Sequence, residues 1–404
     1  MEKVNFEELK IKLEKEKEDI EKNVKEIIKK VKEEKDKAIF YFTEKFDKVK
    51  LISLKVSEEE IKESKKYLRG NIFEYVKKAR ERIEKYHKKQ IPKGFKIKEN
   101  DIEIEFKFEP IEKVGIYIPG GQAPLISTVL MTVIPAKIAK VKEIYIASPP
   151  SFNGKIHPLI IATCDYLGVK NIFSVGGVCA ISAFAFGTET IPKVDLIAGP
   201  GNKYVNMAKK LLYGEVGIDL PAGPSEIVIF SDSTGNPEFI EYDLKAQIEH
   251  TDGIGILITT DEKIGEKLED KIEKGYWLVV KDEKQAIEII NYISPEHLQV
   301  ISKKPDIFKK CKAGAIFIGN YTPTTIGDYF AGPSHVLPTG KSARFSSGVS
   351  VFTFLRSYAI IKAKKTFIKK YGKYIEEIAE TEGLENHKIS VKIRRTVLGW
   401  KRPL

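Results

Sequence analysis

The chain has 404 residues, of which 42% are hydrophobic and 31% are charged, and its formal net charge is +11 at pH 7. A chain of this length exceeds what one hydrophobic core usually holds, so two or more lobes are expected. No apolar run reaches the roughly 18 residues of a membrane span, and the first residues lack a signal-peptide pattern, so we expect a cytoplasmic protein. The positive charge does not indicate a nucleic-acid binder, because the lysines alternate with glutamates along helical stretches.

The cysteine pattern narrows the chemistry further. Cys164, Cys179 and Cys311 are far apart and show no CxxC spacing. This argues against a disulfide framework or a zinc site made of thiolates. Reduced, mostly structural thiols are expected.

The two ends of the chain are predicted to be mainly helical. Residues 4–47 and 57–90 carry Lys, Glu, Leu and Ile at helical spacing, which predicts two long amphipathic helical segments. Residues 95–108 then alternate apolar and polar side chains, which is typical of a β-hairpin. The basic segment 357–404 is again predicted to be helical.

Two series of alternating strands and helices are predicted between these ends. The first series has strands at 115–118, 143–147, 171–175 and 196–198, and helices at 128–139, near 160, at 180–186 and at 204–212. The second has strands at 227–230, 254–259, 277–280 and 315–318, and helices at 237–249, 263–274 and 284–292. This alternation predicts α/β lobes with parallel sheets covered on both faces. Two such lobes favour a ligand site at their interface.

Four of the six histidines stand among polar or glycine-rich neighbours, namely His250, His297, His335 and His387. Neutral imidazole binds zinc and also titrates near neutrality, so this pattern indicates a metal site beside an acid–base pair. His87 and His157 have plainer surroundings, for which solvent or helix-end roles suffice.

Two of these surroundings are compatible with metal or ligand binding. Gln247 and His250 lie three apart near the end of a predicted helix, so both could chelate one ion; a histidine that interacts with the helix dipole is the alternative. Asp328 and His335 bracket a loop that is constrained by glycine and proline, which favours ligand binding, whereas a surface turn is the alternative.

Other motifs carry both a functional and a plain interpretation. The adjacent Glu296 and His297 could divide proton transfer between them, or could simply begin a helix. The turn 199–202 lies between a strand and a helix and could hold an anionic group, or be an ordinary turn, and the chain has no GxGxxG fingerprint. Ser225 and Glu226 lie near the expected junction of the lobes.

Taken together, several stretches resemble the histidinol dehydrogenase family. They occur in the family's order and are GIYIPGGQAPLISTVLMTVIPAKIA, AGPGNKYV, LPAGPSEI, AQIEHTDG, SPEHLQV, GDYFAGPSHVLPTGKSARFSSGVSVFTF and EGLENHKISV. The resemblance covers roughly residues 110–395, and the combination is far more specific than any single motif. It implies a zinc-dependent enzyme that oxidises L-histidinol to L-histidine and consumes two NAD+.

The resemblance also implies roles for individual residues. One Zn2+ per subunit would be bound by Gln247, His250, Asp328 and His387, with His387 supplied by the other subunit of an intertwined homodimer. Substrate would be contacted by these four ligands and by Ser225, His297, His335 and Glu382. NAD would be contacted by Tyr117, Cys179 and Asn202. Cys179 departs from the family, which has Gln there, and a thiol cannot donate the two hydrogen bonds of an amide.

In the mechanism that the resemblance implies, His297 accepts the hydroxyl proton while hydride leaves for NAD, which gives L-histidinaldehyde. Glu296 then activates water, and a second NAD takes a second hydride. Zinc orients the substrate and carries no electrons. No cysteine matches a nucleophile motif, which disfavours a thioester route.

The family fold is two incomplete Rossmann-like lobes with parallel sheets, plus helical extensions at both termini that form the dimer. The implied domains are an N-terminal extension (1–24), a discontinuous α/β lobe with the catalytic and zinc residues (25–113 and 226–350), an NAD-binding α/β lobe (114–225) and a C-terminal dimerisation extension (351–404).

Three alternatives stay open from the sequence. A same-family dehydrogenase of another small alcohol is the nearest, although the presence of His335 and Glu382 argues against it. A zinc hydrolase would use Glu296 to activate water without any nicotinamide. A non-enzymatic binding protein is the third alternative. Such a protein would not need His, Asp, Glu and Gln gathered in constrained loops, which argues against it.

Overall fold

The computed structural model describes the whole chain except residues 16–19, 121–122, 222, 224, 250–252 and 398–404. The chain forms two compact units. We call them the main unit (Met1–Ile91 and Pro110–Phe354) and the hairpin unit (Pro92–Glu109 and Leu355–Leu404). The chain therefore leaves the main unit twice.

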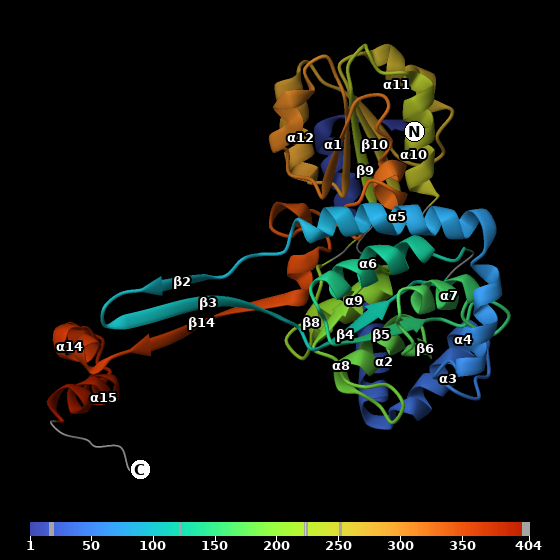
Figure 1. Cartoon of the computed structure of the whole chain (residues 1–404). Coiled ribbons are helices and arrows are strands. Elements are labelled where there is room, and N and C mark those ends of the chain that lie inside the picture. Colours follow the sequence, from blue (N-terminus) through green and yellow to red (C-terminus); the bar gives the residue numbers. More distant parts are fainter. Residues whose placement is uncertain (16–19, 121–122, 222, 224, 250–252, 398–404) are drawn as a thin grey trace. The chain divides into compact units, whose positions relative to one another are not determined.

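The first sheet of the main unit has five parallel strands in the order β6-β5-β4-β7-β8 (Figure 1). These strands are β4 (Lys113–Tyr117), β5 (Glu143–Ser148), β6 (Ile172–Ser174), β7 (Leu196–Ala198) and β8 (Gly217–Ile218). The intervening helices are α6 (Ile126–Ile138), α7 (Pro158–Tyr166), α8 (Gly177–Phe186) and α9 (Lys203–Leu212). The strands are nearly all apolar because helices cover both faces of the sheet. The predicted first series is confirmed, to within a few residues at each boundary.

The second sheet of the main unit has six parallel strands in the order β1-β11-β10-β9-β12-β13. These are β1 (Glu2–Lys3), β9 (Glu226–Ser231), β10 (Ile254–Thr259), β11 (Tyr276–Val279), β12 (His297–Ile301) and β13 (Ala315–Ile318). Its helices include α10 (Pro237–Ile248), α11 (Glu262–Glu269), α12 (Glu283–Ile293) and α13 (Thr324–Tyr329). The second series is confirmed, but β1 and β12 were not predicted.

The N-terminal helices divide between the two sheets. They are α1 (Phe6–Lys15), α2 (Glu21–Glu34), α3 (Asp36–Asp47), α4 (Glu58–Ser64) and α5 (Gly70–Lys88). Helix α1 contributes Leu9 to the core of the second sheet. Helices α2 and α3 contribute Val24, Val31 and Ile39 to the core of the first sheet. The two long helical segments predicted here are thus several shorter helices, and the domain boundaries implied by the resemblance stay a prediction.

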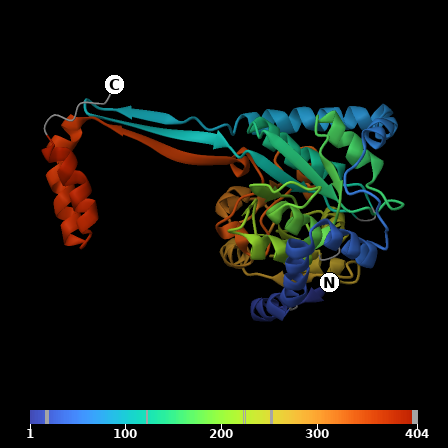
Figure 2. The same cartoon turned by 90° about the horizontal axis from the view of Figure 1, so that it is seen from below.

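The hairpin unit contains a three-stranded sheet in the order β14-β3-β2 and two helices (Figure 2). Strands β2 (Phe95–Lys98) and β3 (Ile102–Pro110) form the predicted antiparallel hairpin. Strand β14 (Leu355–Ala363) shows that the helical prediction for 357–363 was wrong, because these residues add a strand to the hairpin. Helices α14 (Lys365–Thr381) and α15 (Glu385–Thr396) confirm that prediction as far as residue 396, and residues 398–404 lie outside the described part of the chain.

Among the described residues, no helix combines the length and the apolar character that crossing a membrane requires.

Candidate active site

A cleft of about 1790 Å³ in the main unit gathers most of the predicted site residues. It lies past the carboxyl ends of β4 and β7 in the first sheet and beside the amino ends of β9, β10 and β12 in the second. The carboxyl ends of parallel strands are where α/β sheets bind ligands, so this end of the first sheet is a candidate ligand site. The volume exceeds the 300–1,000 Å³ typical of a site for one small ligand. The predicted residues that line it are Tyr117, Asn202, Ser225, Glu296, His297, Asp328 and His335.

The adjacent pair Glu296 and His297 stands at the entry to β12, in the interior of the second sheet. Both are buried, with exposed fractions of 7% and 5%, yet both line the cleft. A Glu296 carboxylate oxygen accepts a hydrogen bond from the Glu226 backbone N–H at 3.2 Å. The alternative that this pair begins a helix is therefore wrong, since His297 begins a strand paired on both sides.

The His297 imidazole lies between two carboxylates. Its Nδ1 is 3.8 Å from Glu296 Oε2, and its Nε2 is 3.4 Å from Asp328 Oδ1. Both distances are too long for well-formed hydrogen bonds, and neither ring nitrogen has such a partner among the described residues. The ring is thus held by charge and packing, and its nitrogens can serve a ligand.

Burial and charge act in opposite directions on this pair. Burial raises the pKa of Glu296, while His297, the Glu226 N–H and Ser225 oppose that effect. For His297, burial disfavours the charged ring, but the Glu296 and Asp328 carboxylates outweigh it and raise the pKa. A carboxyl and an imidazole coupled in this way are typical of groups that exchange protons with a substrate.

Helix α10 faces β12 with polar side chains. The Gln299 amide donates to Asp243 Oδ2 at 2.7 Å, and both residues are buried. Gln299 lies two residues after His297 on the strand, and Asp243 lies four before Gln247 on the helix, so each pair shares one face. The hydrogen bond therefore fixes the helix face that carries Gln247 against the strand face that carries His297.

His335 connects the two lobes of the main unit. Its Nδ1 lies 2.8 Å from the Asp328 carbonyl oxygen, which can only accept, so Nδ1 is the donor. In the neutral ring Nε2 is then an acceptor, and Thr128 Oγ1 on α6 lies 3.1 Å from it. Helix α6 belongs to the first sheet, so this contact crosses the cleft.

The predicted zinc ligands can be compared with the structure only in part. Gln247 is buried, and its Nε2 has no hydrogen-bond partner within the described part of the chain. Asp328 is on α13, which packs against α10. His250 lies outside the described residues, and His387 belongs to the hairpin unit, as does Glu382.

The residues present fit a zinc ion in their chemistry. In the described ranges no three His, Cys, Asp or Glu side chains gather as a metal-binding group. However, Gln247 is buried with its amide Nε2 unpaired within the described part of the chain, and the Asp328 carboxylate faces the His297 ring. The Gln247 amide oxygen and the Asp328 carboxylate are two of the four predicted ligand groups. Oxygen donors together with imidazole nitrogens suit Zn2+.

The side of the cleft where nucleotide contacts are predicted is formed at the ends of β4 and β7. The Tyr117 hydroxyl accepts a hydrogen bond from Gly177 N–H at 3.2 Å, so its own proton remains for a ligand. Burial raises the pKa of Tyr117 to about 12, which keeps that proton in place. The Asn202 Oδ1 caps α9 by accepting from the N–H groups of Tyr204 and Val205, each at 3.1 Å.

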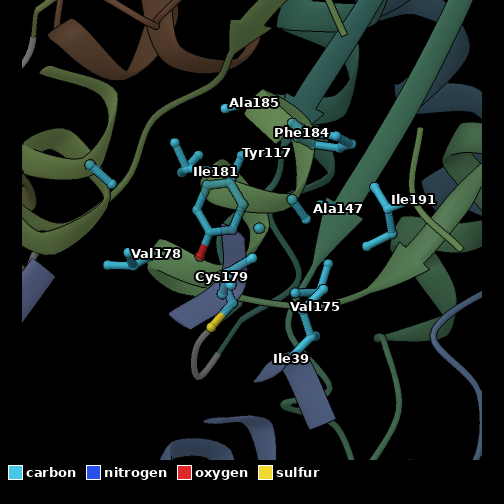
Figure 3. Packing of buried hydrophobic residues seen from close by; sticks show 14 of the residues in the cluster. Ile39, Tyr117, Ala147, Val175, Val178, Cys179, Ile181, Phe184, Ala185 and Ile191 are labelled. Carbon is cyan, nitrogen blue, oxygen red and sulfur yellow. The ribbon is translucent and has the colours of Figure 1, made fainter. Parts of the chain in front are cut away.

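Cys179 lies outside the cleft, unlike the other two predicted nucleotide contacts, Tyr117 and Asn202. Its side chain is buried in the core of the first sheet and is not among the residues that line the cleft. Figure 3 shows Cys179 in the same apolar cluster as Val175, Ile39 and the Tyr117 ring. Burial raises the pKa of this thiol to about 12.

Sequence reasoning missed Thr128, Asp243 and Gln299. Thr128 lies in a mostly apolar helix that also contains Thr132, so nothing marked it. The other two left a weak signal: the strand HLQVI is polar at alternate positions, and Asp243 precedes Gln247 by one helical turn.

Comparison with known proteins agrees with this α/β oxidoreductase architecture. A model of the family described as histidinol dehydrogenase matches residues 11–395. Histidinol dehydrogenases from Methanocaldococcus jannaschii and Clostridium acetobutylicum are each 44% identical, over 90% of this chain and 89% of theirs. A crystal structure of histidinol dehydrogenase from Elizabethkingia anophelis has a TM-score of 0.87 at 38% identity and covers 94% of this chain and 93% of that one.

These matches define an oxidoreductase with two parallel-sheet lobes. The chain belongs to the histidinol dehydrogenase family, whose members act in histidine biosynthesis.

Proposed function

We propose that the enzyme oxidises L-histidinol to L-histidine through L-histidinaldehyde, in a zinc-dependent reaction that consumes two NAD+. The observation that carries the proposal is the position of His297 between Glu296 and Asp328 in a cleft lined by both sheets. Four electrons leave the substrate as two hydrides, and one water supplies the second carboxylate oxygen.

His297 is the base of the alcohol step in this proposal. Its ring nitrogens have no partner of normal geometry among the described residues, so one can accept the substrate hydroxyl proton as hydride leaves the carbon. The two flanking carboxylates stabilise the imidazolium that results. Glu296 takes the proton of water in the aldehyde step, which gives the hydrate for the second hydride transfer.

The metal would be held by Gln247, His250, Asp328 and His387. When bound, zinc supplies a Lewis acid that orients the substrate imidazole and amine and stabilises negative charge on oxygen. We propose that His387 and Glu382 come from the partner subunit of a homodimer, so that each active site is shared.

The remaining predicted residues bind substrate or nucleotide. Ser225 and His335 line the cleft, as Glu296 and His297 do, which supports a role for them in contacting L-histidinol. Tyr117 and Asn202 line its nucleotide side and would donate hydrogen bonds to NAD through a hydroxyl and an amide. Cys179, with its buried thiol, would act on NAD only through its place at the start of α8.

The test is the number of NADH molecules formed per L-histidinol consumed by zinc-loaded protein. Two NADH per substrate, lost on chelation and in His297→Asn, are expected. His157→Asn is the matched control, because His157 caps α7 outside the cleft and Asn also caps helices well. One NADH per substrate would contradict the role of Glu296 in the aldehyde step. Oxidation of a different alcohol alone, or metal-dependent hydrolysis without NADH, would overturn the proposal.

A further inference from the structure

A fully buried ion pair lies under the turn that follows β7. Lys209, on α9, pairs with Asp219, which directly follows β8, and their side chains are 2% and 0% exposed. Neither residue lines the cleft. Burying two charges costs several kcal/mol per ion, and apolar residues of similar volume often stabilise a fold as well or better. A role in stability alone is therefore a weak explanation for this pair.

Both members of the pair bind the same residue of the turn. The Gly199 N–H donates to Asp219 Oδ2 at 2.8 Å, and the Gly199 carbonyl accepts from Lys209 Nζ at 3.0 Å. Asp219 Oδ1 also accepts from the Leu220 N–H at 2.8 Å, where the chain turns toward the second sheet. The two charges thus fix the peptide groups on both sides of Gly199.

The backbone of Gly199 has an unusual conformation that these hydrogen bonds hold in place. Its φ of +116° is a conformation that residues with a side chain rarely adopt, and a Cβ there would collide with the Tyr117 carbonyl oxygen. The turn continues through Gly201, whose carbonyl accepts from the Asn206 side chain at 2.9 Å, to Asn202. Pro200, Gly201 and Asn202 all line the cleft beside Tyr117.

We propose that Lys209 and Asp219 are positioning residues that hold the turn 199–202 in the shape that receives the dinucleotide. The inference rests on the proposed use of NAD. The pair acts through backbone groups and touches no ligand, so it sets how well NAD binds and leaves the reacting groups of the second sheet unchanged. A turn that is shaped in advance in this way avoids the entropy cost of ordering on binding.

The experiment compares NADH binding, catalysis and stability in matched variants of the full-length, zinc-loaded enzyme. Lys209→Met and Asp219→Asn each leave one buried partner unpaired, and Lys209→Met/Asp219→Leu replaces both charges by apolar groups. Lys193→Met is the control, because Lys193 forms an exposed ion pair with Glu215 in the same lobe. NADH fluorescence gives the Kd, initial rates give KM for NAD and kcat, and thermal melting gives stability.

The double variant separates positioning from stability. We expect the melting temperature to return to the wild-type value, while the Kd for NADH stays about ten- to a hundredfold weaker and kcat at saturating NAD changes less than about threefold. If the double variant binds NADH as tightly as the wild type, the inference is overturned. It is also overturned if NADH affinity falls and recovers together with the melting temperature across the variants. If the single variants do not fold, the double variant still decides. Absence of NADH binding by the wild-type enzyme would instead overturn the proposed use of NAD, and this inference with it.

Discussion

Nε2 of His297, at the start of strand β12, lies 3.4 Å from Oδ1 of Asp328, on helix α13. The strand fixes the imidazole inside a sheet, whereas the helix carries the carboxylate to the wall of the cleft. The proposed base and a proposed zinc ligand are therefore neighbours. A substitution at either residue should therefore change the function of the other.

Asp328→Asn should weaken zinc binding by about ten- to a hundredfold and lower kcat/KM, because an amide is a poorer ligand than a carboxylate and leaves the imidazolium with one counter-charge fewer. Zinc content after dialysis against a competing chelator measures the first effect. The control is Asp306→Asn, which removes an exposed carboxylate paired with Lys309. Unchanged zinc affinity in Asp328→Asn would contradict the assignment of this ligand.

Gln299→Leu should destabilise the protein by about 1–3 kcal/mol, because it leaves the buried Asp243 carboxylate without its hydrogen-bond donor. Urea unfolding measures this loss. Activity should fall as well, since the Asp243–Gln299 hydrogen bond aligns the helix of Gln247 with the strand of His297. Asp243→Asn keeps an acceptor for Gln299, so it should cost less than Gln299→Leu; an equal loss would argue against the hydrogen bond as the cause.

Thr128→Val should raise KM for L-histidinol severalfold with little change in global stability. The substitution preserves shape and removes the hydroxyl beside His335 Nε2, a hydrogen bond of about 0.5–1.5 kcal/mol. Thr132→Val is the control, because the Thr132 hydroxyl binds the Thr128 carbonyl within the same helix and does not contact His335. Equal effects of the two substitutions on KM would show that the helix, and not the contact with His335, is responsible.

The three thiols should resist a disulfide reagent at pH 8 until the protein unfolds. Burial raises the pKa of Cys179 to about 12 and that of Cys311 to about 11, and it also raises the pKa of Cys164. Fast modification of the native protein would contradict this burial.

The same shifts imply a loss of stability at alkaline pH. A thiol in the unfolded chain ionises near its ordinary value of about 8.5, before the folded one does. Its contribution to stability is complete below that pH and is lost as pH rises toward the folded pKa. The free energy of unfolding should therefore fall above about pH 9, and it should fall less in Cys179→Val. Parallel curves for the two proteins would contradict the role of this thiol.

The strands that could be predicted from sequence were apolar runs between glycine or proline turns, such as β4 and β7. Strand β12 escaped because His297 and Gln299 interrupt its apolar pattern on the face toward α10. Strand β14 escaped because its residues are mostly exposed and run into a helix with no turn residue between. The periodicity of apolar residues in a sequence reflects which side chains are buried. Strands with polar or exposed faces are therefore hard to predict from it.

The residues of the candidate site also differ in whether they could be predicted from the sequence. The polar residues of constrained loops, such as Asp328, were visible in the sequence, and the resemblance supplied their partners. Thr128 and Lys209 were invisible, because a threonine in an apolar helix and a lysine in an amphipathic one look ordinary. Only the fold shows that the first meets His335 across the cleft and that the second is buried under Gly199.

The pairing of Glu2 and Lys3 with Tyr276 and Trp277 sets an order of events during synthesis. The lobe of the first sheet, with helices α2 and α3 on it, has all of its chain once about residue 220 has left the ribosome. The second sheet must wait, since its edge strand β1 and the Leu9 helix are made first, but the other strands of this sheet begin only at Glu226. Residues 2–15 thus stay without the second sheet while the lobe of the first sheet folds. Until the second sheet is made, Leu9 has no core to pack into.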